Sequence, residues 1–141
     1  MSTGPALAAL VAQLLTAVEG LTHYPVPNAQ PSIMSVPHAW LEREVCHKSC
    51  RMLGWFPKGA TIYLDSSLDP VNDLAARSIL LHELVHFVQQ ESGAYAMLPD
   101  CLAWNERERE ALTAQFEFLR RASAPAEVYA ALGPRPAPMG C

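Results

Sequence analysis

Residues 77–90 read Arg77-Ser-Ile-Leu-Leu-His-Glu-Leu-Val-His-Phe-Val-Gln-Gln90. His82 and His86 are four positions apart in this segment, so in a helix they project from the same face. Two imidazoles placed in this way can both bind one zinc ion, at about 2.0–2.1 Å. Glu83 follows the first histidine and can take a proton from a water at the metal without being a ligand itself. The segment therefore predicts a metal-binding helix.

The residues around these positions predict that the helix is buried, because they are apolar on nearly all sides. Burying unpaired polar groups is unfavourable, and one metal ion would give both histidines a partner. In the alternative interpretation the histidines are core residues bonded to the backbone, and Glu83 lies on a solvated edge. The apolar positions are Ile79, Leu80, Leu81, Leu84, Val85, Phe87 and Val88.

Size and composition predict one globular domain. The chain has 141 residues, of which 50% are hydrophobic and 17% charged. We expect residues 1–133 to form this domain and residues 134–141 to form a tail, because the tail has no core-forming pattern. The net charge of −4 gives no reason to expect nucleic acid or an anionic membrane as a partner. No apolar run reaches the length of a bilayer span, so we expect no membrane-spanning segment.

The N-terminal residues predict an amphipathic helix of the folded domain. Residues 1–18 contain no Lys or Arg, so the positive segment of a signal peptide is missing. A signal removed earlier, with Met1 added in its place, remains an alternative. Pro5 and Gly20 mark the ends of the helix. Its apolar face comprises Leu7, Leu10, Val11, Leu14, Leu15 and Val18.

The chain has four cysteines, at positions 46, 50, 101 and 141, in a spacing that is poor for a structural zinc site. An oxidised pair, either Cys46 with Cys50 or one of these with Cys101, would suit a secreted or periplasmic protein. Free thiols in a cytoplasmic protein are the alternative. We favour a disulfide, because residues 47–49 have the composition of an exposed turn.

The remaining segments predict an α+β fold. A turn at residues 57–60 makes the second and third expected strands an antiparallel hairpin. We expect a small antiparallel sheet of about three strands packed on the metal-binding helix and on further helices. The expected strands are 32–36, 51–56 and 61–64, and the expected helices after the first are 37–45, 73–90, 102–121 and a short helix that ends at Gly133.

A catalytic zinc normally has three protein ligands, and the downstream helix offers three glutamates. Glu106 and Glu110 share one face of this helix, whereas Glu108 points about 200° away from them. An alternating run of Glu and Arg is also typical of a solvated helix face with salt bridges.

The pattern from residue 31 to residue 120 resembles small bacterial zincin-like metallopeptidases. His-Glu-Leu-Val-His is similar to the zincin active-site signature, and no further histidine follows where the metzincin branch needs one. Glu110-Ala111 resembles the Glu-Ala step of the gluzincin branch. This resemblance implies that His82, His86 and Glu110 hold the zinc, with Glu106 as the alternative third ligand.

The resemblance implies a zinc-dependent hydrolase, most simply a metallopeptidase that acts on a peptide or protein substrate. Glu83 would be the general base, and residues 61–64 the edge strand along which a peptide lies. Tyr95, His47 and Tyr63 are candidates for a donor to the oxyanion. The alternative is a zincin-like binding or regulatory module with a structural zinc and no general peptidase activity. The small size of the chain supports this alternative.

Overall fold

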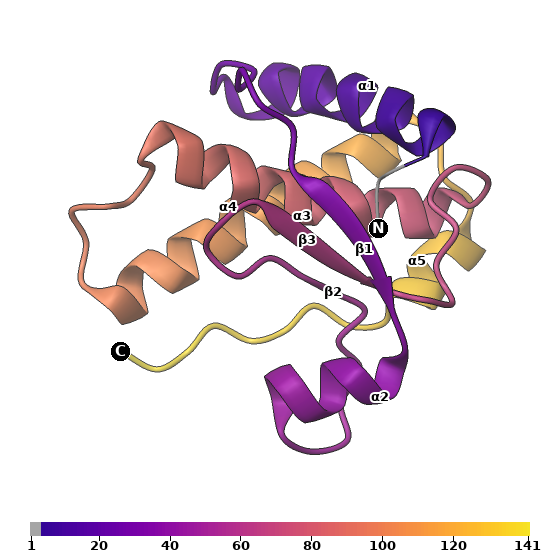
Figure 1. Cartoon of the computed structure of the whole chain (residues 1–141). Coiled ribbons are helices and arrows are strands. Elements are labelled where there is room, and N and C mark those ends of the chain that lie inside the picture. The colour runs from indigo at the N-terminus through magenta and orange to yellow at the C-terminus, as the bar shows by residue number, and fades with distance from the viewer. Residues whose placement is uncertain (1–3) are drawn as a thin grey trace.

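A computed structural model describes residues 4–141 and confirms a small α+β domain (Figure 1). The described part of the chain holds five α-helices, one π-helical turn and a mixed sheet of three strands. The helices are α1 (Pro5–Thr22), α2 (His38–Leu41), α3 (Leu74–Ser92), α4 (Asp100–Arg121) and α5 (Ala126–Leu132). The π-helical turn is η1 (Glu42–Cys46), and the strands are β1 (Ser32–Val36), β2 (Gly54–Trp55) and β3 (Thr61–Asp65).

The sheet has the order β1-β3-β2, which places β3 in the centre. β2 and β3 pair antiparallel, with Gly54 opposite Leu64, so the predicted hairpin is confirmed. β1 and β3 pair parallel, with Ser32 opposite Thr61, so the prediction of a wholly antiparallel sheet is wrong. The reason is the strand order: β2 runs back in the opposite direction to β1, and the hairpin then places β3 between the two, so that β3 runs in the direction of β1. β3 is therefore the central strand, and the prediction that residues 61–64 form an edge strand is wrong. β2 is an edge strand instead.

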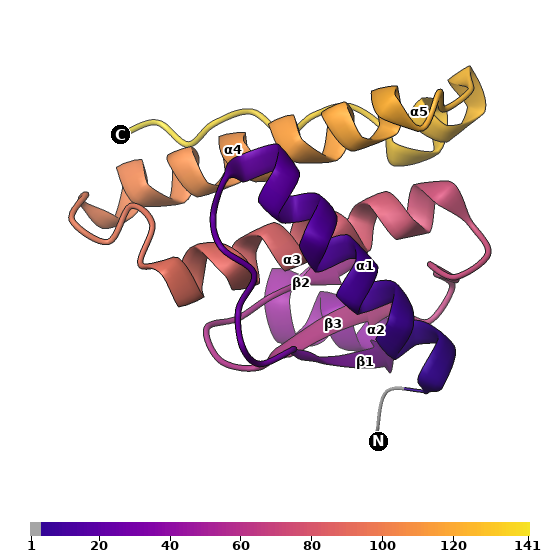
Figure 2. The ribbon, with the colours of Figure 1, turned by 90° about the horizontal axis from the view of Figure 1, so that it is seen from above.

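Helix α3 is the centre of the molecule (Figures 1 and 2). α1 and α4 pack on it, and β2 and β3 contact it from the side of the sheet. It is buried on nearly all sides, as its apolar sequence predicts. Its buried residues are Ala76, Ser78, Leu80, Leu81, His82, Glu83, Leu84, Val85, Phe87, Val88 and Gln89.

The two ends of α3 follow from its sequence. The Asp73 side chain accepts a hydrogen bond from the backbone N–H of Ala76 at 2.8 Å and caps the first turn. Gly93 ends the helix with φ 67°, a left-handed conformation that glycine adopts without steric penalty. These caps fix where α3 begins and ends.

Helix α1 contributes one face to the core and leaves the other exposed. By length and composition alone it could cross a membrane, so the expectation that no apolar run reaches that length is wrong. In the folded chain it crosses over α3 and reaches α4, and it contacts both helices (Figure 2). Its buried side chains are Leu10, Val11, Leu14, Leu15 and Val18.

Two disulfides join the four cysteines. Cys46–Cys50, one of the predicted pairs, closes the loop after η1. Cys101 pairs with Cys141 rather than with Cys46 or Cys50, and so ties the last residue of the chain to the start of α4. The tail at residues 134–141 therefore folds back on the domain.

The loop after η1 is also held by His38, whose ring bonds two acceptors. Nδ1 lies 2.6 Å from Oδ2 of the buried Asp65, and Nε2 lies 2.8 Å from the carbonyl oxygen of Cys50. The Cys50 carbonyl and then the Asp65 carboxylate raise the pKa of His38. Burial would raise the pKa of Asp65, but hydrogen bonds from Ser67 and His38 outweigh it and lower that pKa.

We predict that His38→Gln changes how stability depends on pH. A histidine whose pKa is raised by folding stabilises the fold below its unfolded pKa of about 6.5, and this contribution is lost as the pH rises through the folded value. The difference in unfolding free energy between wild type and variant should therefore shrink from about pH 6 to about pH 9. Urea denaturation across this range measures it. A difference that is constant or grows with pH would contradict the assignment.

Candidate metal centre

His82, His86 and Glu108 meet where α3 packs on α4. Nε2 of His82 lies 2.9 Å from one carboxylate oxygen of Glu108, and Nε2 of His86 lies 3.0 Å from the other. One potential ligand atom from each of the three side chains lies within 4.8 Å of the others. Helices α3 and α4 approach closely because Ala111 and Ala114 on α4 are small and buried.

The third residue of this group is Glu108, which corrects the choice of Glu110. Helix α4 packs against both α3 and α1, and its glutamates lie on different surfaces. Glu108 points away from Glu106 and Glu110, as its spacing predicts. The side of α4 on which it lies is, however, the side that faces His82 and His86. Glu110 accepts a hydrogen bond from Tyr24 Oη at 2.8 Å. Glu106, the other candidate, lies 3.5 Å from Arg109.

Each histidine ring is held by a glutamine. Nδ1 of His82 lies 2.9 Å from Oε1 of Gln115, and Nδ1 of His86 lies 2.9 Å from Oε1 of Gln89. Both glutamines are buried. The sequence analysis missed them, although each shares a helix face with a group member: Gln89 lies about one turn after His86, and Gln115 lies about two turns after Glu108.

The hydrogen bonds of the amide groups fix which atom of each glutamine faces the histidine. Nε2 of Gln89 donates to the Arg107 carbonyl and to Glu110, both at 3.0 Å and both pure acceptors. Nε2 of Gln115 donates to Ser78 Oγ at 3.2 Å, and the Ser78 hydroxyl donates to the Ala75 carbonyl at 2.8 Å. The oxygen of each amide therefore faces a ring, and this oxygen can only accept.

It follows that both histidines carry a proton on Nδ1, because each Nδ1 must donate to an amide oxygen. When the rings are neutral, the lone pairs of both Nε2 atoms face the carboxylate of Glu108. Three acceptors that converge in a largely buried place are satisfied either by a second proton on each ring, which makes ion pairs with Glu108, or by a metal ion that all three bind. Two imidazole nitrogens and one carboxylate oxygen are a donor set that catalytic zinc sites use. The residues thus fit zinc.

The charges of this group shift its pKa values in the directions that ion pairing requires. Burial alone would raise the pKa of Glu108, but His82 and His86 hold it well below its usual range. Burial alone would lower the pKa of His82, but the carboxylates of Glu108 and Glu83 outweigh it and raise that pKa. Burial also raises the pKa of Glu83.

Glu83 lies beside the group, between α3 and the edge strand β2. Its carboxylate accepts a hydrogen bond from the backbone N–H of Phe56, directly after β2. Gly54 allows this close approach, because a Cβ there would lie 3.1 Å from Cγ of Glu83. A larger residue at position 54 would therefore displace the carboxylate.

Two cavities open on this site, and both are lined by Met52, Gly54, His82, Glu83 and Glu108. The larger has a volume of about 620 Å³, and its wall includes Phe56, Trp104 and Arg107. The smaller has a volume of about 170 Å³, and its wall includes Leu112, Phe116 and residues 133–136. The site is thus reached from two sides.

The three candidates for an oxyanion donor lie elsewhere. Tyr63 stacks on Trp40, with ring centroids 4.8 Å apart. The Tyr95 hydroxyl interacts with Tyr24 and Glu110. His47 ends η1 and lines neither cavity. Arg107, which precedes Glu108 on α4, does line the larger cavity and is the basic group that the sequence analysis overlooked.

No protein-family model matches the chain, and neither a curated protein nor a solved structure matches it.

We predict that Gln89→Ala and Gln115→Ala each weaken zinc binding about 10- to 100-fold, because a ring without its amide partner loses its orientation and its tautomer. Competition with a coloured chelator measures the affinity. Gln90→Ala is the matched control, since Gln90 bonds Gly59 and contacts neither ring. Equal zinc affinities in the control and in both test variants would contradict this role of the glutamines.

Proposed function

We propose that the chain is a zinc-dependent hydrolase, specifically a metallopeptidase of the gluzincin type with Glu108 as the third ligand. The observation that carries this proposal is the fixed orientation of the two glutamine amides. It turns two imidazole lone pairs and one carboxylate toward the same point, next to Glu83 and to two cavities. A chance His-Glu-Leu-Val-His segment would not need such an arrangement.

His82, His86 and Glu108 would hold the zinc, which when bound supplies a Lewis acid that polarises a water and a carbonyl oxygen. Glu83 would take the proton of the attacking water and later deliver it to the leaving amine. The Phe56 N–H holds the Glu83 carboxylate for this task. Arg107 on the wall of the larger cavity is a candidate to stabilise the charge that develops on the carbonyl oxygen.

The edge strand β2 supports a peptide as the substrate. An extended peptide can add to a free sheet edge through backbone hydrogen bonds. β2 has such an edge, and Met52, Gly54, Trp55 and Phe56 line the larger cavity beside the site. β2 thus replaces β3 in the role that was expected for residues 61–64.

The two disulfides support an oxidising compartment, such as the periplasm or the extracellular space. The length and hydropathy of α1 are also those of a signal sequence, although part of α1 belongs to the core. We therefore propose an exported protein.

One observation favours the alternative of a binding or regulatory module without general peptidase activity. Residues 133–136 form part of the wall of the smaller cavity and narrow the access to the site. A protein of this kind would bind zinc and peptides and would not turn over a broad set of substrates.

Glu83→Gln separates the two functions. In the zinc-loaded protein we expect it to lower peptide hydrolysis about 10²- to 10⁴-fold, because the general base is lost, with zinc content unchanged. Hydrolysis of a mixed peptide library, followed by mass spectrometry, measures this. Glu91→Gln, an exposed position on the same helix, is the control. A Glu83→Gln protein as active as wild type would exclude the mechanism.

A further inference from the structure

The last residues of the chain lie across the proposed site. We call residues 133–140 the C-terminal segment. After α5 it turns back and runs beside α4, on the side of β2 (Figures 1 and 2). Residues 133–136 line the smaller cavity together with His82, Glu83 and Glu108, and Pro136 also lines the larger one. The segment therefore covers one of the two approaches to Glu83, the one through the smaller cavity.

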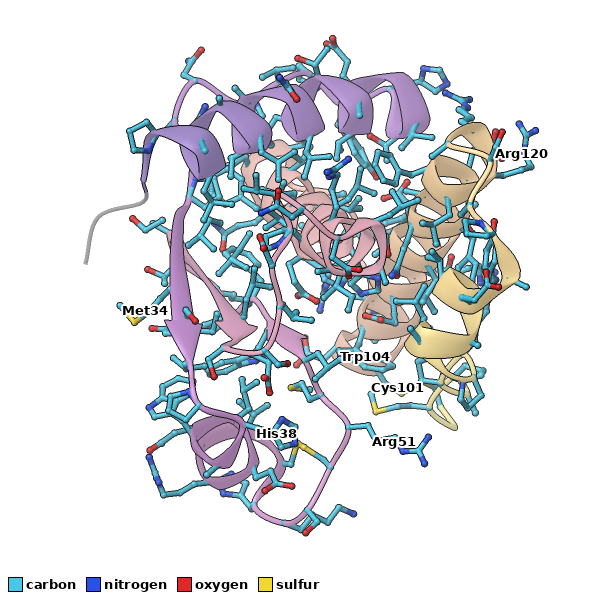
Figure 3. The ribbon with its side chains drawn as sticks, turned by 90° about the vertical axis from the view of Figure 1, so that its right-hand side faces the viewer. Met34, His38, Arg51, Cys101, Trp104 and Arg120 are labelled. Carbon is cyan, nitrogen blue, oxygen red and sulfur yellow. A yellow bond between two sulfur atoms is a disulfide. The ribbon has the colours of Figure 1, made fainter. Side chains whose placement is uncertain are left out.

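Three contacts on α4 hold the segment. The guanidinium of Arg135 lies 4.1 Å from the centroid of the Phe116 ring, a cation–π contact. The Asn105 side chain accepts a hydrogen bond from the N–H of Met139 at 2.9 Å and donates one to its carbonyl at 2.8 Å. The Cys101–Cys141 disulfide then fixes the end of the chain (Figure 3).

The opposite wall of the smaller cavity is formed by the strand edge. Met52, Leu53 and Gly54 line it, so the cavity is enclosed by the strand edge, α4 and the segment. Pro134, Pro136 and Pro138 alternate along the segment and lack the N–H with which a strand would pair. In the described residues no backbone hydrogen bond joins the segment to β2. It borders the cavity without adding a strand to the sheet.

We propose that the space between β2 and α4 is a binding groove for an extended peptide, and that the C-terminal segment closes one side of this groove. The inference rests on the proposed function and adds regulation: with the Cys101–Cys141 bond intact, the approach through the smaller cavity is covered. A peptide that enters the groove when the segment moves away carries N–H groups at the alternate positions and so pairs with β2. It also carries a basic side chain that takes the place of Arg135 on the ring of Phe116.

The disulfide matters because it tethers the far end of the segment, whereas the chain already tethers the near end to α5. A segment on a short tether is present at an effective concentration of about millimolar, and a tether at both ends also prevents it from swinging away from α4. Without the bond, Arg135 and Asn105 still hold the segment, but it can move away from α4, and the groove is open for part of the time. The Cys101–Cys141 disulfide thus controls whether a peptide can enter the groove.

The test compares Cys101→Ser/Cys141→Ser, which frees the segment, with Cys46→Ser/Cys50→Ser as the matched control. The readout needs neither zinc nor activity. It is the rate at which dilute peroxide oxidises Met52, a residue that lines both cavities, to its sulfoxide. Met97, with an exposed fraction of 96%, is the internal reference. Peptide mass spectrometry gives both rates.

We expect the ratio of the Met52 rate to the Met97 rate to rise several-fold in the freed variant and to stay unchanged in the control. If the double serine variant fails to fold, Asn105→Ala/Arg135→Ala loosens the segment with both disulfides intact and should raise the ratio in the same direction. An unchanged ratio in a folded freed or loosened variant would overturn the proposal.

A fluorescent peptide with the sequence of residues 133–140 tests the groove itself. Its anisotropy should show at least tenfold tighter binding to the freed variant than to wild type, and Phe116→Leu in the freed variant should reverse this gain. No gain on freeing the segment would contradict the groove. Zinc-loaded freed protein that binds the peptide but cleaves no library peptide would support the groove and exclude the peptidase.

Discussion

The hydrogen bonds of two buried glutamines determine the chemistry of this site. Gln89 and Gln115 each turn an amide oxygen to a histidine, because the nitrogen of each amide is taken by acceptors on other residues. Neutral imidazoles held in this way present their Nε2 lone pairs to Glu108. Without the glutamines either ring could rotate or change its tautomer, and the three groups would no longer be arranged to bind one metal ion.

The same arrangement shows how a largely apolar helix tolerates polar residues. α3 buries His82, Glu83 and Gln89 together with its apolar residues. In the part of the chain that the structure describes, every buried side-chain N or O atom has a hydrogen-bond partner. Glu110 belongs to this network, since it accepts a hydrogen bond from the Gln89 amide, and the oxygen of the same amide holds the ring of His86.

The sequence predicts well what local rules decide and less well what depends on packing between distant segments. The bounds of β1 and the start of α3 are set locally: β1 spans the expected residues 32–36, and α3 begins at Leu74, one residue after the expected start. The choice between Glu108 and Glu110 depends on which side of α4 faces α3, and α4 has two buried sides. The sequence does not show which of these sides faces α3, so the choice of Glu110 depended on the resemblance of Glu110-Ala111 to the gluzincin Glu-Ala step. In the structure Glu110 faces Tyr24.

Two other differences between the sequence-based predictions and the structure also arise from packing between distant segments. The parallel pairing of β1 with β3 depends on the path of the crossover, which the strand pattern does not contain. The proline-rich tail lacks apolar periodicity, but a disulfide and Asn105 hold it on the domain. Side-chain contacts over long sequence separations thus place the C-terminal segment next to Glu83. There it borders the cavity between the candidate metal centre and the strand edge.

The most direct test of the central claim is the zinc content of the purified, zinc-reconstituted protein by elemental mass spectrometry, for wild type, Glu108→Gln and Glu110→Gln. The account predicts about one zinc per chain in wild type, a marked loss in Glu108→Gln, and near-complete retention in Glu110→Gln. Full retention in Glu108→Gln, or no zinc in the wild type, would contradict the claim that His82, His86 and Glu108 form a metal centre.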